Sequence, residues 1–91
     1  MDDGLPVLPG FREIAQRRRR VFDELAGARR AAGLSQTEVA ARMGTSQSVV
    51  ARLESGEIDA RLSTLQRYAA AVGRELELGV RRPGQRREEG P

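Results

Sequence analysis

The sequence predicts a small all-α bundle of four or five helices, followed by a short β-strand. Apolar residues recur every three or four positions over most of the chain, as they do on the buried face of a helix. Serines and glycines interrupt these stretches at the positions where helices usually begin and end. Strict alternation of polar and apolar residues replaces the helical spacing only over residues 74–81. With 91 residues, of which 38% are hydrophobic, the chain can form one domain with a modest core.

The chain divides into three parts. Residues 1–10 contain glycines and prolines among a few apolar residues and are predicted to form a flexible lead. Residues 83–91 are rich in proline, glycine and charge, which predicts a disordered tail. A single domain over residues 11–82 lies between them.

The first predicted helix extends from Phe11 to Ala32. Gly33 follows it and is expected to end it in a left-handed conformation. Gly27 lies inside this stretch and costs about 1 kcal/mol relative to alanine, so the stretch holds either one helix or two. The apolar positions on its predicted buried face are Phe11, Ile14, Val21, Phe22, Leu25, Ala28 and Ala32.

Two short helices are predicted next. Ser35 and Glu38 have the spacing of a capping box, in which each side chain bonds the backbone amide of the other residue. The helix that they begin is expected to end at Gly44. Ser46 is the expected N-cap of the next helix, which ends near Ser55 and Gly56. The inward-facing residues of the two helices are Val39, Ala40, Met43, Val50 and Leu53.

A last helix and a strand complete the predicted domain. Asp59 is expected to cap a helix that Gly73 ends, with Tyr68 at the edge of the core. The core stripe of this helix is Leu62, Leu65, Ala69 and Val72.

Leu76, Leu78 and Val80 would share one face of the predicted strand at about residues 74–81. A lone strand is not stable in water, so its simplest partner is the same strand of a second copy, paired about a twofold axis. The alternative is a last helical turn followed by coil. Of these two structures, the alternation favours the strand.

The composition excludes several classes of function. The chain has no Cys and no His, which rules out disulfides, thiolate or imidazole catalysis and the usual zinc sites. We therefore predict no metal, no cofactor and no enzyme activity. No apolar run approaches the roughly 20 residues of a membrane span, and the acidic start lacks the features of a signal peptide, so a cytoplasmic location is expected. The net charge of +3 is compatible with nucleic-acid binding but does not show it.

Residues 36–55 contain the most informative motif. Two short helices joined by about four residues make a helix-turn-helix. Ala40 is small where the two helices must approach each other closely. Gly44 falls at the turn, where a left-handed backbone is required.

Three segments carry a resemblance to a known family: Gly33–Ala40, Gly44–Val50 and Leu53–Gly56. They resemble the Xre/Cro group of phage-repressor-like DNA-binding domains, and the resemblance covers about residues 22–73. It implies a phage-repressor-like bundle of four to five helices with a helix-turn-helix. It also implies that the helix Gln47–Glu54 is the recognition helix and lies in the major groove of DNA.

The resemblance implies base contacts by Gln47, Ser48, Val49 and Arg52. The amide of Gln47 can pair with N6 and N7 of adenine, and Arg52 can read O6 and N7 of guanine. Val49 stands where the family often has a polar residue. The base contact open to its apolar side chain is one with a thymine methyl group. The plainer alternative is that Gln47 and Ser48 are ordinary solvated helix residues.

Phosphate contacts are expected from Gln36, Thr45, Ser46 and Arg61. Gln36 matches a family glutamine that holds a phosphate at the start of the first motif helix. Thr45 and Ser46 add hydroxyl donors, although capping alone explains Ser46, and Arg61 precedes the last helix.

Two sets of charged residues have other expected roles. Arg29 and Glu54 match positions that commonly form an internal ion pair, and we expect them to be structural. Four consecutive arginines, residues 17–20, point all around a helix. They are either a solvated surface with some pairing to Glu13, Asp23 and Glu24, or a phosphate-facing patch.

The sequence thus predicts a DNA-binding transcriptional regulator, a repressor that binds a palindromic operator in double-stranded DNA as a homodimer. Residues 65–78 are similar to the ending of antitoxins of the HigA and HipB kind, which implies a toxin partner and autoregulation of a shared operon. A third hypothesis is a protein interaction module that has kept the fold and lost DNA binding.

Overall fold

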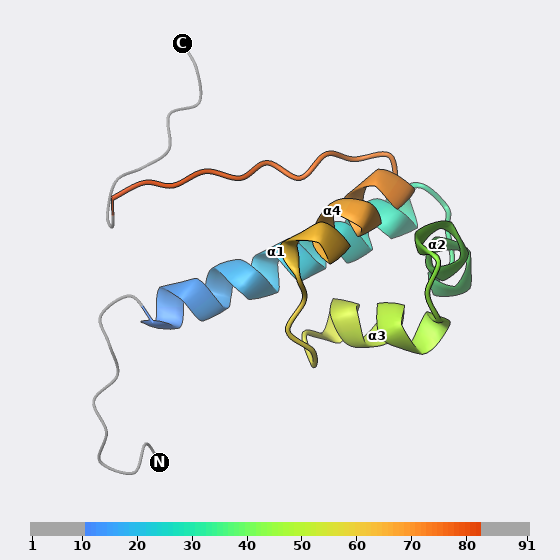
Figure 1. Ribbon diagram of the computed structural model, residues 1–91, viewed down its shortest axis with the longest axis horizontal. Helices are drawn as coiled ribbons and strands as arrows, with labels where there is room; N and C mark the ends of the chain where they lie inside the picture. The colour runs from blue at the N-terminus through green and yellow to red at the C-terminus, as the bar shows by residue number, and fades with distance from the viewer. Residues whose placement is uncertain (1–10, 83–91) are drawn as a thin grey trace.

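The computed structural model describes residues 11–82, so the predicted flexible lead (1–10) and disordered tail (83–91) lie outside the described residues. Four helices make up this region and form a bundle (Figure 1). The all-α prediction is confirmed for the described residues. The helices are α1 (Phe11–Ala31), α2 (Gln36–Met43), α3 (Gln47–Ser55) and α4 (Leu62–Ala71).

Helix α1 is one continuous helix of 21 residues that passes through Gly27 without a break. Its C-terminal half joins the core through Phe22, Leu25 and Ala26, which are buried. Residues 12–20 are all exposed, and Figure 1 shows this half of α1 extending past the other helices. Only part of the predicted apolar stripe of α1 is therefore used for packing within the described chain.

Helices α2 and α3 begin and end where the caps predict. The Ser35 hydroxyl accepts a hydrogen bond from the Glu38 amide at 3.0 Å, and the Glu38 carboxylate accepts one from the Ser35 amide at 2.7 Å. These bonds lower the pKa of Glu38. Gly44 ends α2 with φ +74°, and Ser46 caps α3 by accepting from the Val49 amide at 3.3 Å.

The core lies where α2, α3 and α4 meet the C-terminal half of α1. Its largest fully buried side chains are Val39, Val50, Leu53 and Tyr68. Tyr68 is 1% exposed, so it lies inside the core and not at the edge that the sequence suggests. Its hydroxyl has a buried partner, described below, which is why a polar ring can be buried there.

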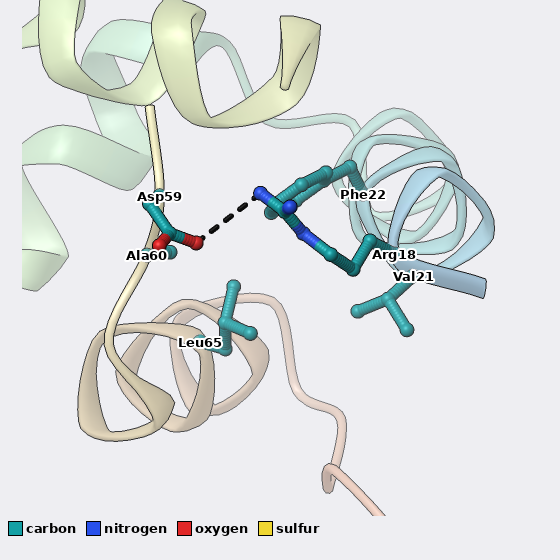
Figure 2. Close-up of a pocket in the computed structure, with 6 residues that line it drawn as sticks. All are labelled: Arg18, Val21, Phe22, Asp59, Ala60 and Leu65. Atoms are coloured by element: carbon teal, nitrogen blue, oxygen red, sulfur yellow. Dashed lines mark hydrogen bonds and ion pairs between the residues drawn. The ribbon is translucent and has the colours of Figure 1, made fainter. Parts of the chain in front are cut away.

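The start of α4 differs from the prediction. Arg61, not Asp59, is the N-cap residue, and it makes no capping hydrogen bond through its side chain. The Asp59 carboxylate instead pairs with Arg18 Nη2 of α1 at 3.2 Å, at the rim of a small apolar pocket (Figure 2). Asp59 lies three residues before Leu62, outside the position from which an N-cap side chain reaches the first-turn amides.

Two arginines tie α2 and α4 together reciprocally. Arg42 of α2 donates to the Ala71 carbonyl at 2.8 Å, and Arg67 of α4 donates to the Met43 carbonyl at 3.3 Å. Each guanidinium thus satisfies a carbonyl at the C-terminal end of the other helix, where unpaired acceptors and the helix dipole favour a cation.

The predicted strand at 74–81 is wrong for the single chain. Residues 74–82 form neither helix nor strand, and Figure 1 shows them as an extended coil that leaves the end of α4. Leu76 packs against the core, whereas Leu78 is 54% exposed and Val80 is fully exposed. A strand needs a second strand for its backbone hydrogen bonds, and the rest of the described chain consists of helices and the loops that join them.

Candidate nucleic-acid interface

The front of α3 is polar and open to solvent. Gln47, Ser48 and Arg52 are exposed, while Val50 and Leu53 on the other side of the same helix are buried. Val49 is half-buried and packs against the core, so only part of its side chain faces solvent. Three of the four residues expected to contact bases are therefore presented together on one short helix.

The residues expected to contact phosphate come from the turn before α3 and from the starts of α2 and α4. Thr45 is half-buried in the turn, and the Ser46 hydroxyl both caps α3 and lies 3.2 Å from the hydroxyl of Ser48. Gln36 begins α2, at the end of that helix away from the turn, and its side chain contacts Gln47 at the start of α3. Arg61 is exposed at the end of the loop that follows α3, far along the chain from the turn.

Arg29 and Glu54 form an ion pair between α1 and α3. Arg29 Nε donates to Glu54 Oε2 at 2.7 Å, and Nη2 donates to Oε1 at 3.2 Å, so the contact is bidentate. Arg29 Nη1 also donates to the Leu34 carbonyl at 2.9 Å. The two side chains are only 13% and 10% exposed.

Glu54 gathers further donors. The Tyr68 hydroxyl donates to Oε2, and Gln36 Nε2 donates to Oε1 at 3.0 Å. Burial by itself raises the pKa of Glu54, but the hydrogen bonds from Arg29, Tyr68 and Gln36 bring it below its usual value. Burial, together with the bond to Glu54, raises the pKa of Tyr68. Glu54 is therefore ionised and Tyr68 protonated at neutral pH.

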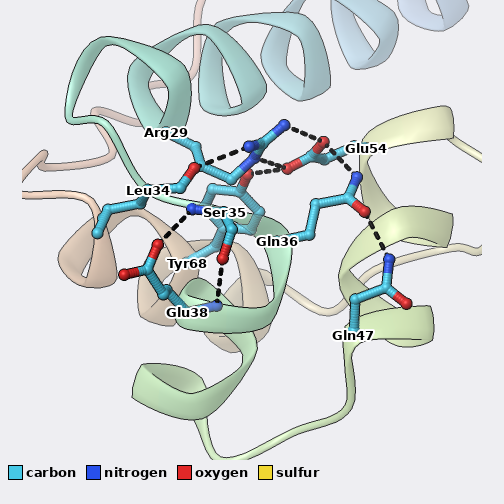
Figure 3. Close-up of polar contacts among 8 residues, drawn as sticks. All are labelled: Arg29, Leu34, Ser35, Gln36, Glu38, Gln47, Glu54 and Tyr68. Carbon is cyan, nitrogen blue, oxygen red and sulfur yellow. Dashed lines mark hydrogen bonds and ion pairs between the residues drawn. The ribbon is translucent and has the colours of Figure 1, made fainter.

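The network continues from Glu54 to the surface. Gln36 Oε1 accepts a hydrogen bond from Gln47 Nε2 at 2.6 Å, as Figure 3 shows. Sequence reasoning treated Gln36 and Gln47 as separate DNA contacts and missed both this bond and the part played by Tyr68. No short-range pattern could have shown them, because the paired residues come from different helices.

Two of the four consecutive arginines are engaged within the chain. Arg18 pairs with Asp59, while Arg19 pairs with Asp23 at 3.2 Å and donates to the Ser55 carbonyl. Arg17 and Arg20 are exposed on the same helix.

Other kinds of site find little support in residues 11–82. Acidic side chains do not gather there into a group of three that could hold a metal ion. The pocket beside Arg18 has a volume of about 230 Å³, less than the roughly 300–1,000 Å³ of typical small-molecule sites. None of the helices in this region combines the length and apolar character needed to cross a membrane.

A polar, exposed helix that a tight turn holds against a second helix defines a helix-turn-helix protein of the DNA-binding type. Comparison with protein families agrees with this class, since the helix-turn-helix family matches residues 25–85, more than half of the chain. The chain belongs to this family, in its Xre-type branch.

Curated relatives are antitoxins of Mycobacterium tuberculosis. Antitoxin HigA1 is 44% identical over 78 residues, which cover 86% of this chain and 52% of HigA1. Putative antitoxin HigA2 is 39% identical over 82 residues, which cover 82% of this chain and 81% of HigA2. Putative antitoxin HigA3 is 48% identical over 56 residues, which cover 59% of this chain and 51% of HigA3. The chain thus spans about half the length of HigA1 and HigA3, and no solved structure gives a significant match.

Proposed function

We propose that this protein is a sequence-specific DNA-binding regulator of transcription, acting as a repressor, with α3 as its recognition helix. The observation that carries this proposal is the exposure of Gln47, Ser48 and Arg52 on one side of a helix whose other side fills the core. The role is binding in the cytoplasm, at the nucleoid, and not catalysis.

The exposed side chains suit the edges of base pairs. Gln47 offers a donor and an acceptor to adenine, Arg52 offers two donors to guanine, and Ser48 adds a hydroxyl. The exposed part of Val49 suits a thymine methyl group.

Contacts to the DNA backbone set the position of the protein on the duplex and its affinity for DNA. Gln36 retains one amide N–H after its bond to Glu54, and this N–H is a donor for a phosphate oxygen. Thr45, Ser46 and Arg61 are the other proposed phosphate contacts.

The size of α3 supports the proposal of a homodimer on a palindromic operator. Nine residues at 1.5 Å each make about 13 Å, which spans only about four base pairs at 3.4 Å each. Two copies would present two such helices to successive major grooves about 34 Å apart. The exposed apolar side chains of Leu78 and Val80 are the proposed dimer contact.

Selection of bound duplexes from a random pool tests the DNA-binding proposal. We expect a palindromic consensus for the wild-type protein and a changed or weakened consensus for Gln47→Ala combined with Arg52→Ala. The matched control is Gln66→Ala combined with Arg30→Ala, which removes the same residue types at exposed positions outside α3. An unaltered consensus in the α3 double variant would contradict the assignment.

A second candidate function is an antitoxin of a type II toxin–antitoxin pair, which neutralises a toxin and regulates its own operon. The observation that favours it is the similarity to three HigA antitoxins. The test is to co-express the chain with the product of the adjacent gene and to follow growth and complex formation by size-exclusion chromatography. A toxic neighbour that stays fully active and unbound would exclude this function.

A further inference from the structure

Glu54 sets the direction of a chain of hydrogen bonds that runs to the protein surface. An ionised carboxylate only accepts hydrogen bonds. Its oxygens already receive N–H groups from Arg29 and the hydroxyl of Tyr68, and Gln36 approaches Oε1 at 3.0 Å. Gln36 must therefore turn its NH₂ group to Glu54, because the opposite orientation would place its carbonyl oxygen against a carboxylate oxygen.

The orientation of Gln36 then determines that of Gln47. With its NH₂ group turned inward, Gln36 presents Oε1 to α3 as an acceptor. Gln47 meets this acceptor with Nε2 at 2.6 Å (Figure 3). One N–H of Gln47 is thereby occupied, which leaves its Oε1 and one N–H for a ligand.

These two remaining groups match one purine better than the other. In the major groove, adenine offers a donor at N6 and an acceptor at N7, whereas guanine offers acceptors at both N7 and O6. A Gln47 amide with one free N–H can bond both groups of adenine. At guanine, its Oε1 would face the acceptor O6. An amide that is free to turn can direct both of its N–H groups to guanine.

We infer that Glu54 is a positioning residue for base recognition. Acting through Gln36, it fixes the orientation of the Gln47 amide, so that the purine that Gln47 contacts is adenine rather than guanine. This inference rests on the proposed function and adds to it a specificity determinant that lies in the core, away from the DNA.

The test removes the buried network and keeps both glutamines. The triple variant Arg29→Met, Glu54→Leu and Tyr68→Phe replaces the polar members together, so that no buried charge is left without its partner. Circular dichroism and thermal melting check its fold. Gln36→Met is the second variant, which breaks the relay at a half-buried surface position.

The measurement is competition binding with duplexes that differ only in the purine facing Gln47. For the wild-type protein we expect adenine to be favoured over guanine by about tenfold or more, since a good bidentate contact discriminates by about 1–3 kcal/mol. Both variants should lose most of this ratio, while discrimination at the base pair contacted by Arg52 changes less than about twofold. Arg42→Met is the matched control, because it removes a 2.8 Å bond between helices that has no link to α3.

Two outcomes would overturn the inference. One is a folded triple variant, or Gln36→Met, that keeps the wild-type ratio of adenine to guanine binding. The other is a wild-type protein that binds a defined operator but does not distinguish adenine from guanine, in which case the proposed function survives. Absence of any sequence preference would overturn the proposed function as well.

Discussion

At the scale of the residue, the Glu54 carboxylate joins all four helices. It lies on α3 and receives hydrogen bonds from Arg29 of α1, Gln36 of α2 and Tyr68 of α4. A buried carboxylate is unfavourable unless it is paired and hydrogen-bonded, and here four donor groups meet that need. Glu54 is therefore a point at which stability and the geometry of the recognition surface depend on the same atoms.

Glu54→Gln is expected to destabilise the fold by about 3 kcal/mol, because it leaves the buried Arg29 guanidinium without its carboxylate. Urea denaturation at pH 7 measures this loss. Glu75→Gln, at an exposed position outside the helices, should change the free energy of unfolding by less than about 0.5 kcal/mol. Equal stability of the two variants would show that the ion pair contributes little.

The lowered pKa of Glu54 predicts a dependence of stability on acid pH. Because the pKa is lower in the folded protein than in the unfolded chain, the stabilisation is complete above the usual value of 4.5 and is lost as the pH falls through the folded pKa. Denaturation curves between pH 7 and pH 3 should be less pH-dependent for Glu54→Gln than for the wild-type protein. Glu38, whose pKa is also lowered, contributes in the same direction, so Glu38→Gln is the comparison variant. Identical pH profiles for wild type and Glu54→Gln would refute the role of Glu54.

At the scale of the element, glycine acts differently in a helix and at a helix end. Gly44 has φ +74° where α2 turns toward α3, and nothing lies within 4 Å of the position of an added Cβ. Backbone conformation and not space is therefore what requires glycine there. Gly27 is also uncrowded, but it lies in the interior of α1.

The two glycines form a matched pair of substitutions. Gly44→Ala is expected to destabilise the protein by about 1 kcal/mol, because an L-residue is strained in the left-handed region. Gly27→Ala is expected to stabilise it by about 0.5–1 kcal/mol, because alanine loses less backbone freedom in a helix. Thermal melting, monitored by circular dichroism, measures the sign of the change in stability for each variant. Shifts of the same sign would argue against this explanation.

At the scale of the whole molecule, the described chain leaves apolar groups exposed that a second copy could cover. Val80 is fully exposed and Leu78 is 54% exposed, at the end of an extended segment. Apolar side chains in such a position favour association, since burying one contributes about 1.5–3 kcal/mol.

Val80→Asp is expected to weaken dimerisation at least tenfold, because a charge would have to be desolvated at the contact. Light scattering coupled to size-exclusion chromatography measures the molar mass over a concentration series. Gln66→Asp, at an exposed position on α4, should leave the dimer intact. A wild-type protein that stays monomeric both free and on DNA would exclude the proposed homodimer.

Local signals in the sequence are sufficient to place the ends of α2 and α3 and most of the core. Caps and left-handed turns are interactions within about four residues, so the roles of Ser35 with Glu38, of Ser46 and of Gly44 follow from the order of residues alone. The spacing of apolar residues likewise identifies the buried faces of α2 and α3, and with them the exposed front of the helix-turn-helix.

Contacts between distant side chains depend instead on how the helices pack. Arg18 pairs with Asp59 across 41 residues, and Gln36 meets Gln47 across 11 residues. The alternation over 74–81 suits a strand, but a strand exists only where a partner supplies hydrogen bonds, and the described chain supplies none of that kind. Local patterns specify what a segment can become, whereas packing of the helices decides which of its groups find partners.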